Sequence, residues 1–152
     1  MTITGLDLSP AMLEIARQRA ADLGRVATLV EGDAQALPFG DASFDTVVCT
    51  LGLGSIPDHR AAITEMHRVL RPGGQLLLLD HVAAPNPLLR AGQRLVAEIT
   101  SRIAADWQTR RSLPLVEQAG LVVDRSERSK AGTVERLRAV KPGQMGRTRG
   151  AS

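Results

Sequence analysis

Four consecutive leucines at residues 76–79, bounded by Gln75 and Asp80, constrain the fold of this chain most strongly. A strand with one face in solvent alternates apolar and polar residues, because successive side chains point to opposite faces. An unbroken apolar run therefore predicts a strand that is covered on both faces, as in a parallel sheet packed between helices. The sequence predicts an α/β fold around this strand.

Further strands and helices are predicted to alternate on its N-terminal side. Short apolar runs predict strands at residues 2–6, 26–30 and 44–50. Between the first two, Ser9 is a predicted N-cap and Pro10 the first residue of a helix. The apolar residues on one face of that helix are Met12, Ile15, Ala16, Ala20 and Leu23. Strands that alternate with helices indicate a mostly parallel, Rossmann-like sheet with right-handed crossovers.

The helix after the third strand is predicted to begin at Asp58 and to end before residues 71–74. Its buried stripe follows the i, i+3, i+7 spacing and consists of Ile63, Met66 and Leu70. Farther on, helices are predicted at residues 88–105 and 112–119. An antiparallel pair of closing strands is predicted at residues 121–123 and 133–140, across a turn at residues 129–132.

The domain is predicted to span residues 1–141, followed by a tail at residues 142–152 that is basic, rich in Gly and Arg, and disordered. Residues 1–124 carry a net charge of −3 and residues 125–152 a net charge of +6. The basic segment is read as a solvated tail, with contact to acidic lipid or nucleic acid as the alternative.

Composition limits the function classes and the compartment. Aromatic residues make up 2% of the chain, so a base-stacking platform for nucleic acid is not expected. Cys49 is the single cysteine, which excludes an intramolecular disulfide. We find neither an apolar run of 18 residues nor a signal-peptide pattern, so the cytoplasm is the predicted location.

Polar residues follow the predicted strands, where parallel sheets bind ligands: Asp7, Asp33, Thr50 and His81. Asp7 can accept hydrogen bonds from both ribose hydroxyls of a nucleotide, or it can serve as a turn aspartate. Asp33 can accept from an adenine amino group while the N–H of Ala34 donates to a ring nitrogen, or it can be a surface carboxylate. Together the two acids are predicted neighbours, spaced for the two ends of an adenosine.

Three segments in the same order resemble successive motifs of the class I S-adenosylmethionine-dependent methyltransferases: GLDLSPAMLEIAR, EGDAQALPFGDASFDTVV and MHRVLRPGGQLLLLD. They are similar in particular to the branch with ubiquinone/menaquinone C-methyltransferases, phospholipid N-methyltransferases and methyltransferase-like thiol methyltransferases. The resemblance covers roughly residues 2–140. It implies that S-adenosylmethionine is the cofactor and that a small or lipid-like molecule is the methyl acceptor. It also implies that Asp7 holds the ribose, Asp33 and Ala34 the adenine, and Thr50 the methionine part.

The chain departs from this family at its start. Family members begin with a strand and an acidic glycine-rich loop, and nothing similar precedes Asp7. We therefore expect an N-terminally truncated sheet that lacks its central strand, between the strands ending at Asp7 and Thr50. Its exposed inner edges predict self-association. A non-catalytic remnant or interaction protein is one alternative. An NAD-dependent oxidoreductase is the other, because Asp7 can also bind the ribose of NAD.

Methyl transfer needs no protein nucleophile, and no catalytic residue is assigned. Positioning and desolvation can supply most of the acceleration. A proton acceptor is needed where the acceptor is protonated, and the candidates are His81 and His67, the second being more typical of a helix surface. Cys49 is predicted to be a small core residue. No cluster of Cys and His supports a metal site.

Overall fold

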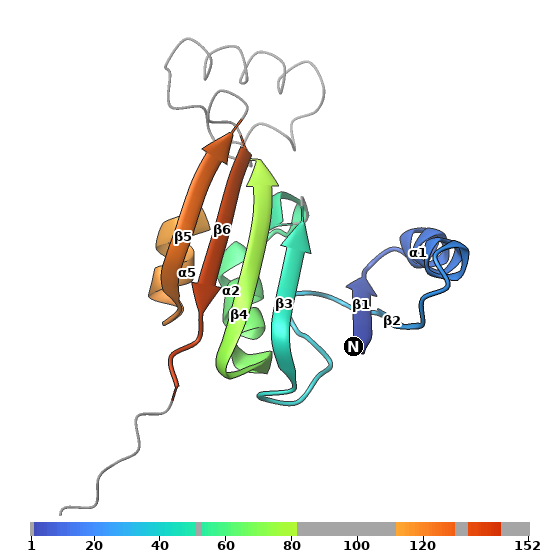
Figure 1. The fold of residues 1–152 in the computed structure, drawn as a ribbon, viewed down its shortest axis with the longest axis horizontal. Coiled ribbons are helices and arrows are strands. Elements are labelled where there is room, and N and C mark those ends of the chain that lie inside the picture. The colour runs from blue at the N-terminus through green and yellow to red at the C-terminus, as the bar shows by residue number, and fades with distance from the viewer. Residues whose placement is uncertain (1, 51–52, 82–111, 130–133, 144–152) are drawn as a thin grey trace, which may run out of the picture.

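The computed structural model of the 152-residue chain describes residues 2–50, 53–81, 112–129 and 134–143 (Figure 1). The strands in these ranges are β1 (Ile3–Asp7), β2 (Ala27–Glu31), β3 (Phe44–Thr50), β4 (Leu70–His81), β5 (Val122–Ser129) and β6 (Val134–Val140). The helices are α1 (Pro10–Asp22), α2 (His59–Val69) and α5 (Ser112–Gln118), with a short 3₁₀ turn, η1 (Leu53–Ser55).

The strands form two sheets. In the first, β1 and β2 pair in parallel. In the second, the order is β3-β4-β6-β5, with β3 parallel to β4 and β6 antiparallel to both β4 and β5. In Figure 1 the arrows of β1 and β3 point the same way, and the two strands belong to different sheets. The predicted α/β fold with a C-terminal antiparallel pair is confirmed.

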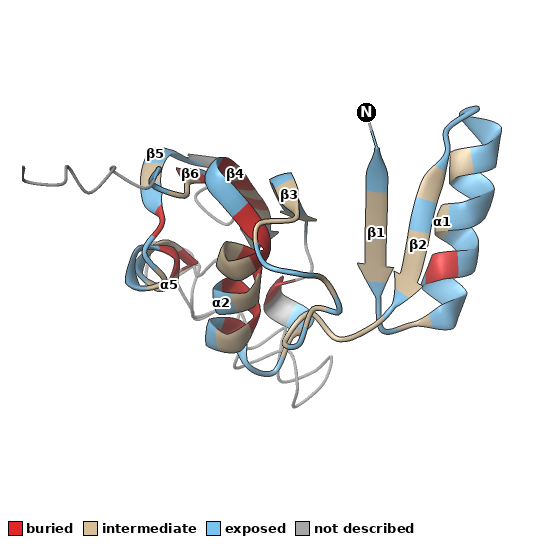
Figure 2. Cartoon of the chain, turned by 90° about the horizontal axis from the view of Figure 1, so that it is seen from below, coloured by how far each residue is buried: buried red, intermediate tan, exposed pale blue. Residues whose placement is uncertain are grey.

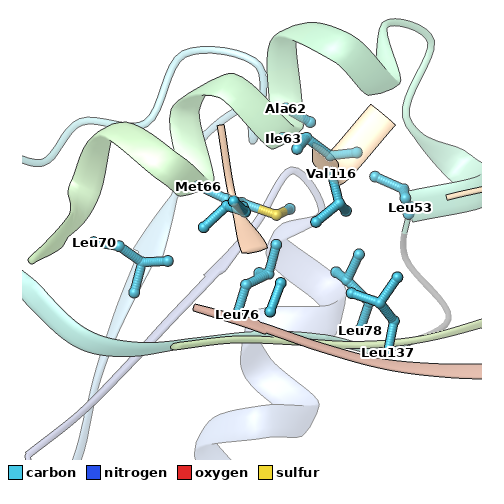
Figure 3. Close-up of a cluster of buried hydrophobic side chains, with 11 residues drawn as sticks. Leu53, Ala62, Ile63, Met66, Leu70, Leu76, Leu78, Val116 and Leu137 are labelled. Atoms are coloured by element: carbon cyan, nitrogen blue, oxygen red, sulfur yellow. The ribbon is translucent and has the colours of Figure 1, made fainter. Parts of the chain in front are cut away.

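The core lies between the four-stranded sheet and α2 (Figure 3). Ile63, Met66 and Leu70 are at most 5% exposed, as the predicted stripe requires. They pack with side chains from the sheet and α5, namely Leu76, Leu78, Leu137 and Val116. Burial of each such side chain contributes about 1.5–3 kcal/mol, so this cluster holds α2 and α5 on the sheet.

The leucine run of β4 is buried more completely on one face than on the other. Leu76 and Leu78 are buried, whereas Leu77 and Leu79 are half-buried. The views in Figures 1 and 2 place α2 and α5 on the same face of the four-stranded sheet. Within the described ranges, helices cover one face of β4, and the prediction that both faces are covered stays a prediction for the other face.

Helix α1 has the predicted start but a different buried face. The Ser9 hydroxyl accepts the N–H of Met12 at 3.4 Å, and Pro10 opens the helix. Leu13 is its one buried residue, while Met12 is 48% and Ile15 is 52% exposed (Figure 2). The predicted stripe was wrong: among the described elements the main contacts of α1 are with β1 and β2, and two strands are too few to cover a broad face.

The boundaries of β4 and β5 differ from the predicted ones, and some predicted segments lie outside the described residues. The break after α2 falls where predicted, but β4 already begins at Leu70, which pairs with Phe44 before a register shift. Strand β5 runs on to Ser129, because it pairs with β6 along its length. The helix at residues 88–105 lies outside the described residues, as do most of the turn at 129–132 and nearly all of the tail at 142–152.

Within the described ranges, no helix is both long enough and apolar enough to cross a membrane.

Candidate functional site

Parallel pairing aligns the carboxyl ends of β1 and β2. Asp7 and Glu31, the last residues of the two strands, are partners in the register. The N–H of Gly32 then donates to the carbonyl oxygen of Asp7 at 3.1 Å. This contact fixes the start of the β2–β3 loop on the end of β1, so Asp7 and Asp33 occupy neighbouring positions at one sheet edge.

Gly32 is favoured at this junction because the chain approaches the Leu6 side chain closely. A Cβ on Gly32 would lie 3.0 Å from Cδ1 of Leu6 and 3.7 Å from Cδ of Pro38. A side chain here would displace Leu6 or push the loop away from β1.

The Asp7 carboxylate is exposed and joins a local turn. Its Oδ1 accepts the N–H of Ser9 at 2.8 Å, immediately before α1. Its Oδ2 accepts no hydrogen bond from the described residues and remains open to a ligand. The turn interpretation of Asp7 is therefore correct, and it uses only half of the carboxylate.

Asp33 is held by its near neighbour Gln35. Oδ1 of Asp33 accepts the backbone N–H of Gln35 at 2.8 Å, and the Gln35 side-chain amide donates to Oδ1 at 3.0 Å and to Oδ2 at 2.8 Å. The backbone hydrogen bond, and then the side-chain one, hold the pKa of Asp33 below its ordinary value, against a smaller opposing effect of burial. Asp33 is thus an ionised acceptor at neutral pH.

Ala34 and Thr50 differ in their surroundings. Ala34 is half-buried and packs against the hydrophobic cluster, which places its backbone at the base of the loop. Thr50 ends β3, pairs with Leu79 and is exposed. The carboxyl ends of β1 and β3 point the same way in Figure 1, while their strands lie in separate sheets.

The other candidates lie in different settings. His67 is half-buried near the C-terminal end of α2, next to Lys141 just beyond β6, and burial first and Lys141 second lower its pKa. His81 ends β4, with its backbone in register with Val134. Cys49 is partly buried against the hydrophobic cluster, as predicted. Among the described residues, no group of three or more His, Cys, Asp or Glu side chains is arranged to hold a metal ion.

Sequence reasoning did not single out Gln35, which lies in the Asp33 loop, or Glu65 and Arg68, which contact the loop from α2. Glu65 and Arg68 form an ion pair at 2.7 Å and also contact the loop backbone. Their i, i+3 spacing in a predicted helix indicates the pair. The loop contacts join residues 28 or more positions apart, which one sequence cannot reveal.

Comparison with known proteins gives a consistent family. The sequence profile described as "Methyltransferase domain" matches residues 1–78, just over half of the chain. A demethylmenaquinone methyltransferase of Staphylococcus epidermidis is 47% identical over 88 residues, which is 58% of this chain and 36% of that protein. The corresponding protein of Staphylococcus aureus is 46% identical over 78 residues, or 51% of this chain and 32% of that protein. The chain therefore matches about a third of the length of these relatives.

Solved structures share the fold. A Bacillus halodurans protein assigned as a methyltransferase superposes with a TM-score of 0.79 at 22% identity, over 93% of this chain and 84% of that one. The [4+2]-cyclase SpnF superposes with a TM-score of 0.76 at 19% identity, over 94% of this chain and 67% of that one. At these identities the likeness shows the fold, and the cyclase illustrates that one fold hosts different reactions.

Proposed function

We propose a function from the premise that this chain belongs to the family described as "Methyltransferase domain". The chain binds S-adenosylmethionine at the carboxyl ends of β1, β2 and β3, and it supports transfer of the methyl group. The observation that carries the proposal is the junction of Asp7 and Asp33 through the Gly32 N–H. It puts one carboxylate at the end of β1 and the other in the loop just after β2, where a nucleoside offers hydroxyl and amino donors.

The donor and acceptor chemistry suits this cofactor. Asp33 is ionised and can accept from an adenine amino group beside the Ala34 N–H. The open Oδ2 of Asp7 can accept from a ribose hydroxyl while Oδ1 stays in its turn. Thr50, at the end of β3, is proposed to face the methionine part.

The residues of the chain would act by position and not by covalent chemistry. The bound cofactor supplies an activated methyl group on a sulfonium sulfur. The two carboxylates would orient the nucleoside end and so fix the direction of the methyl group toward an acceptor. His81 is the candidate to take up a proton from a protonated acceptor, since it ends a strand at the same edge as Thr50.

The acceptor is proposed to be a small, lipid-like molecule. This proposal rests on the relatives, which are named as demethylmenaquinone methyltransferases. A direct test is transfer of a labelled methyl group to a short-chain demethylmenaquinone. Absence of transfer, together with binding of the cofactor, would favour the alternative of a non-catalytic binding protein.

Calorimetry with S-adenosylhomocysteine tests the cofactor site. Asp7→Ala and Asp33→Ala should each weaken binding by about 1.5–3 kcal/mol, the usual contribution of a hydrogen bond to a charged group. Asp22→Ala is the matched control, because Asp22 ends α1 and lies outside the proposed site. Unchanged affinity in both site variants, or tighter binding of NADH than of S-adenosylhomocysteine, would overturn the assignment.

A further inference from the structure

The loop that carries Asp33 and Ala34 is long and has no helix or strand of its own. It connects β2 to β3 and spans residues 32–43. Loops of this length hold a fixed shape only where other elements tie them down. The contacts that tie this loop therefore decide where Asp33 lies.

One contact joins the loop to the beginning of α2 through the side chain of Gln35. Oε1 of Gln35 accepts the N–H of Asp58 at 2.9 Å, while the amide nitrogen of the same side chain donates to the Asp33 carboxylate. Asp58 is the N-cap of α2 and accepts the N–H of Ala61 at 2.9 Å. The Asp33 carboxylate is thus linked through one side chain to the start of the helix.

A second set of contacts joins the loop to Glu65 and Arg68, farther along α2. Oε2 of Glu65 accepts the N–H of Leu37 at 2.8 Å, and Nη2 of Arg68 donates to the Leu37 carbonyl at 3.0 Å. Nη1 of Arg68 donates to the carbonyl of Phe39 at 2.8 Å and to the carboxylate of Asp41 at 2.7 Å. Both polar groups of the Leu37 backbone are therefore held by one pair of side chains.

The ion pair between Glu65 and Arg68 has a defined geometry. Nε and Nη2 of Arg68 donate to the two oxygens of Glu65 at 2.7 Å each, and the side chains are 31% and 19% exposed. A planar guanidinium with two bonds to one carboxylate has a fixed orientation, which a flexible ammonium group does not have. The remaining guanidinium donors therefore point at fixed loop carbonyls.

We propose that Glu65 and Arg68 are positioning residues that set the Asp33 carboxylate and the Ala34 N–H for recognition of an adenine base. The inference rests on the proposed function, because it assigns the loop to the adenine end of the cofactor. It adds that base selectivity depends on residues of α2 that do not touch the ligand.

The test compares two ligands that differ at one position of the base. S-adenosylhomocysteine has an amino donor where S-inosylhomocysteine has a carbonyl oxygen, so an aligned Asp33 favours the first. Arg68→Met should lower the ratio of the two affinities about tenfold, as expected for misalignment of one charge-assisted hydrogen bond. Arg68→Lys keeps the charge but loses the planar guanidinium with its paired donors. It should also lower the ratio of the two affinities. Glu65→Gln is the second, milder variant, chosen to preserve shape.

Arg71→Met is the matched control. Arg71 holds the far end of the same loop, with Nε donating to the carbonyl of Ala42 at 3.2 Å and Nη1 to Asp45 at 2.6 Å. It should leave the adenine-to-hypoxanthine ratio unchanged. Hydrogen exchange of the Leu37 amide gives a readout without ligand, and it should accelerate in the Arg68 and Glu65 variants alone.

The outcomes separate this inference from the proposed function. If the unmodified chain favours S-adenosylhomocysteine and the Arg68 and Glu65 variants keep that preference, the positioning role is refuted and the cofactor site stands. If the unmodified chain shows no preference or no binding, the proposed function fails and this inference fails with it. A general loss of stability would lower both affinities together and leave the ratio unchanged, which also counts against positioning.

Discussion

The two proposed ligand acceptors, Asp7 and Asp33, also take part in local turns. Asp7 caps a turn with Oδ1, and Asp33 closes a turn with Gln35. The sequence left open whether Asp7 was a turn residue and Asp33 a surface carboxylate, or whether both were ligand acceptors. The geometry shows the turn hydrogen bonds of both and is compatible with ligand binding. A carboxylate has about four acceptor sites, so Asp33 keeps acceptor capacity although Gln35 donates to both of its oxygens, and Asp7 keeps Oδ2.

A prediction at the residue scale concerns pH and Glu65. The hydrogen bond from Arg68, more than that from the Leu37 N–H, holds the pKa of Glu65 below its ordinary value of 4.5, while burial opposes the shift. The contribution of Glu65 to stability is therefore present above pH 4.5 and is lost as the pH falls through the lowered pKa. Glu65→Gln should lower Tm at neutral pH, and the difference from the unmodified chain should vanish in acid.

Glu14→Gln serves as the control for that melting experiment. Glu14 and Arg17 form an ion pair with the same i, i+3 spacing on α1, but their side chains are 67% and 60% exposed. Exposed pairs contribute about 0–1 kcal/mol, so this substitution should change Tm little at any pH. Equal effects of the two substitutions would mean that the loop contacts of Glu65 add nothing.

At the scale of elements, the sequence predicted α2 better than α1. The apolar stripe of α2 is confirmed because strands β4 and β6 and helix α5 cover it. Helix α1 carries apolar residues at 12, 13, 15 and 16, so its sequence defines no narrow stripe, and the two strands beneath it select Leu13. In the candidate site, the residues at the strand ends were predictable from the local sequence pattern. The hydrogen bond from Arg68 to Leu37 was not, because it is a tertiary contact between residues 31 positions apart.

A prediction at this scale concerns the end of α2. Nζ of Lys141, beyond β6, donates to the carbonyl of His67 at 2.8 Å and to that of Leu70 at 2.7 Å. A cation here satisfies helix-end carbonyls and opposes the negative end of the helix dipole. Lys141→Met should therefore lower the free energy of unfolding in urea by about 1–2 kcal/mol.

The same substitution has a second readout in His67. Burial is the larger cause of its lowered pKa and the charge of Lys141 the smaller one. An NMR titration of Lys141→Met should show the His67 pKa rising while staying below the ordinary 6.5. Lys141→Arg keeps the charge and should leave the pKa low. A fall in the pKa on loss of Lys141 would contradict the contact.

At the scale of the whole molecule, burial is unevenly distributed. Among the described residues, every buried hydrophobic residue except Leu13 lies at or beyond Leu53, on the side of the four-stranded sheet (Figure 2). The unit formed by β1, α1 and β2 has weak internal packing by comparison. Strands β1 and β3 are each paired on one side within the described sheets.

The unpaired edge of β3 leads to a prediction about self-association. An edge strand presents free N–H and C=O groups to other chains, and a lysine on such a strand opposes pairing. Val48 on β3 is 59% exposed, so Val48→Lys should weaken concentration-dependent association in sedimentation velocity with little loss of stability. Val26→Lys is the control, because Val26 is 92% exposed but precedes β2. A chain that stays monomeric at every concentration would contradict the prediction. If Val26→Lys suppressed association equally, apolar surface and not the strand edge would be the cause.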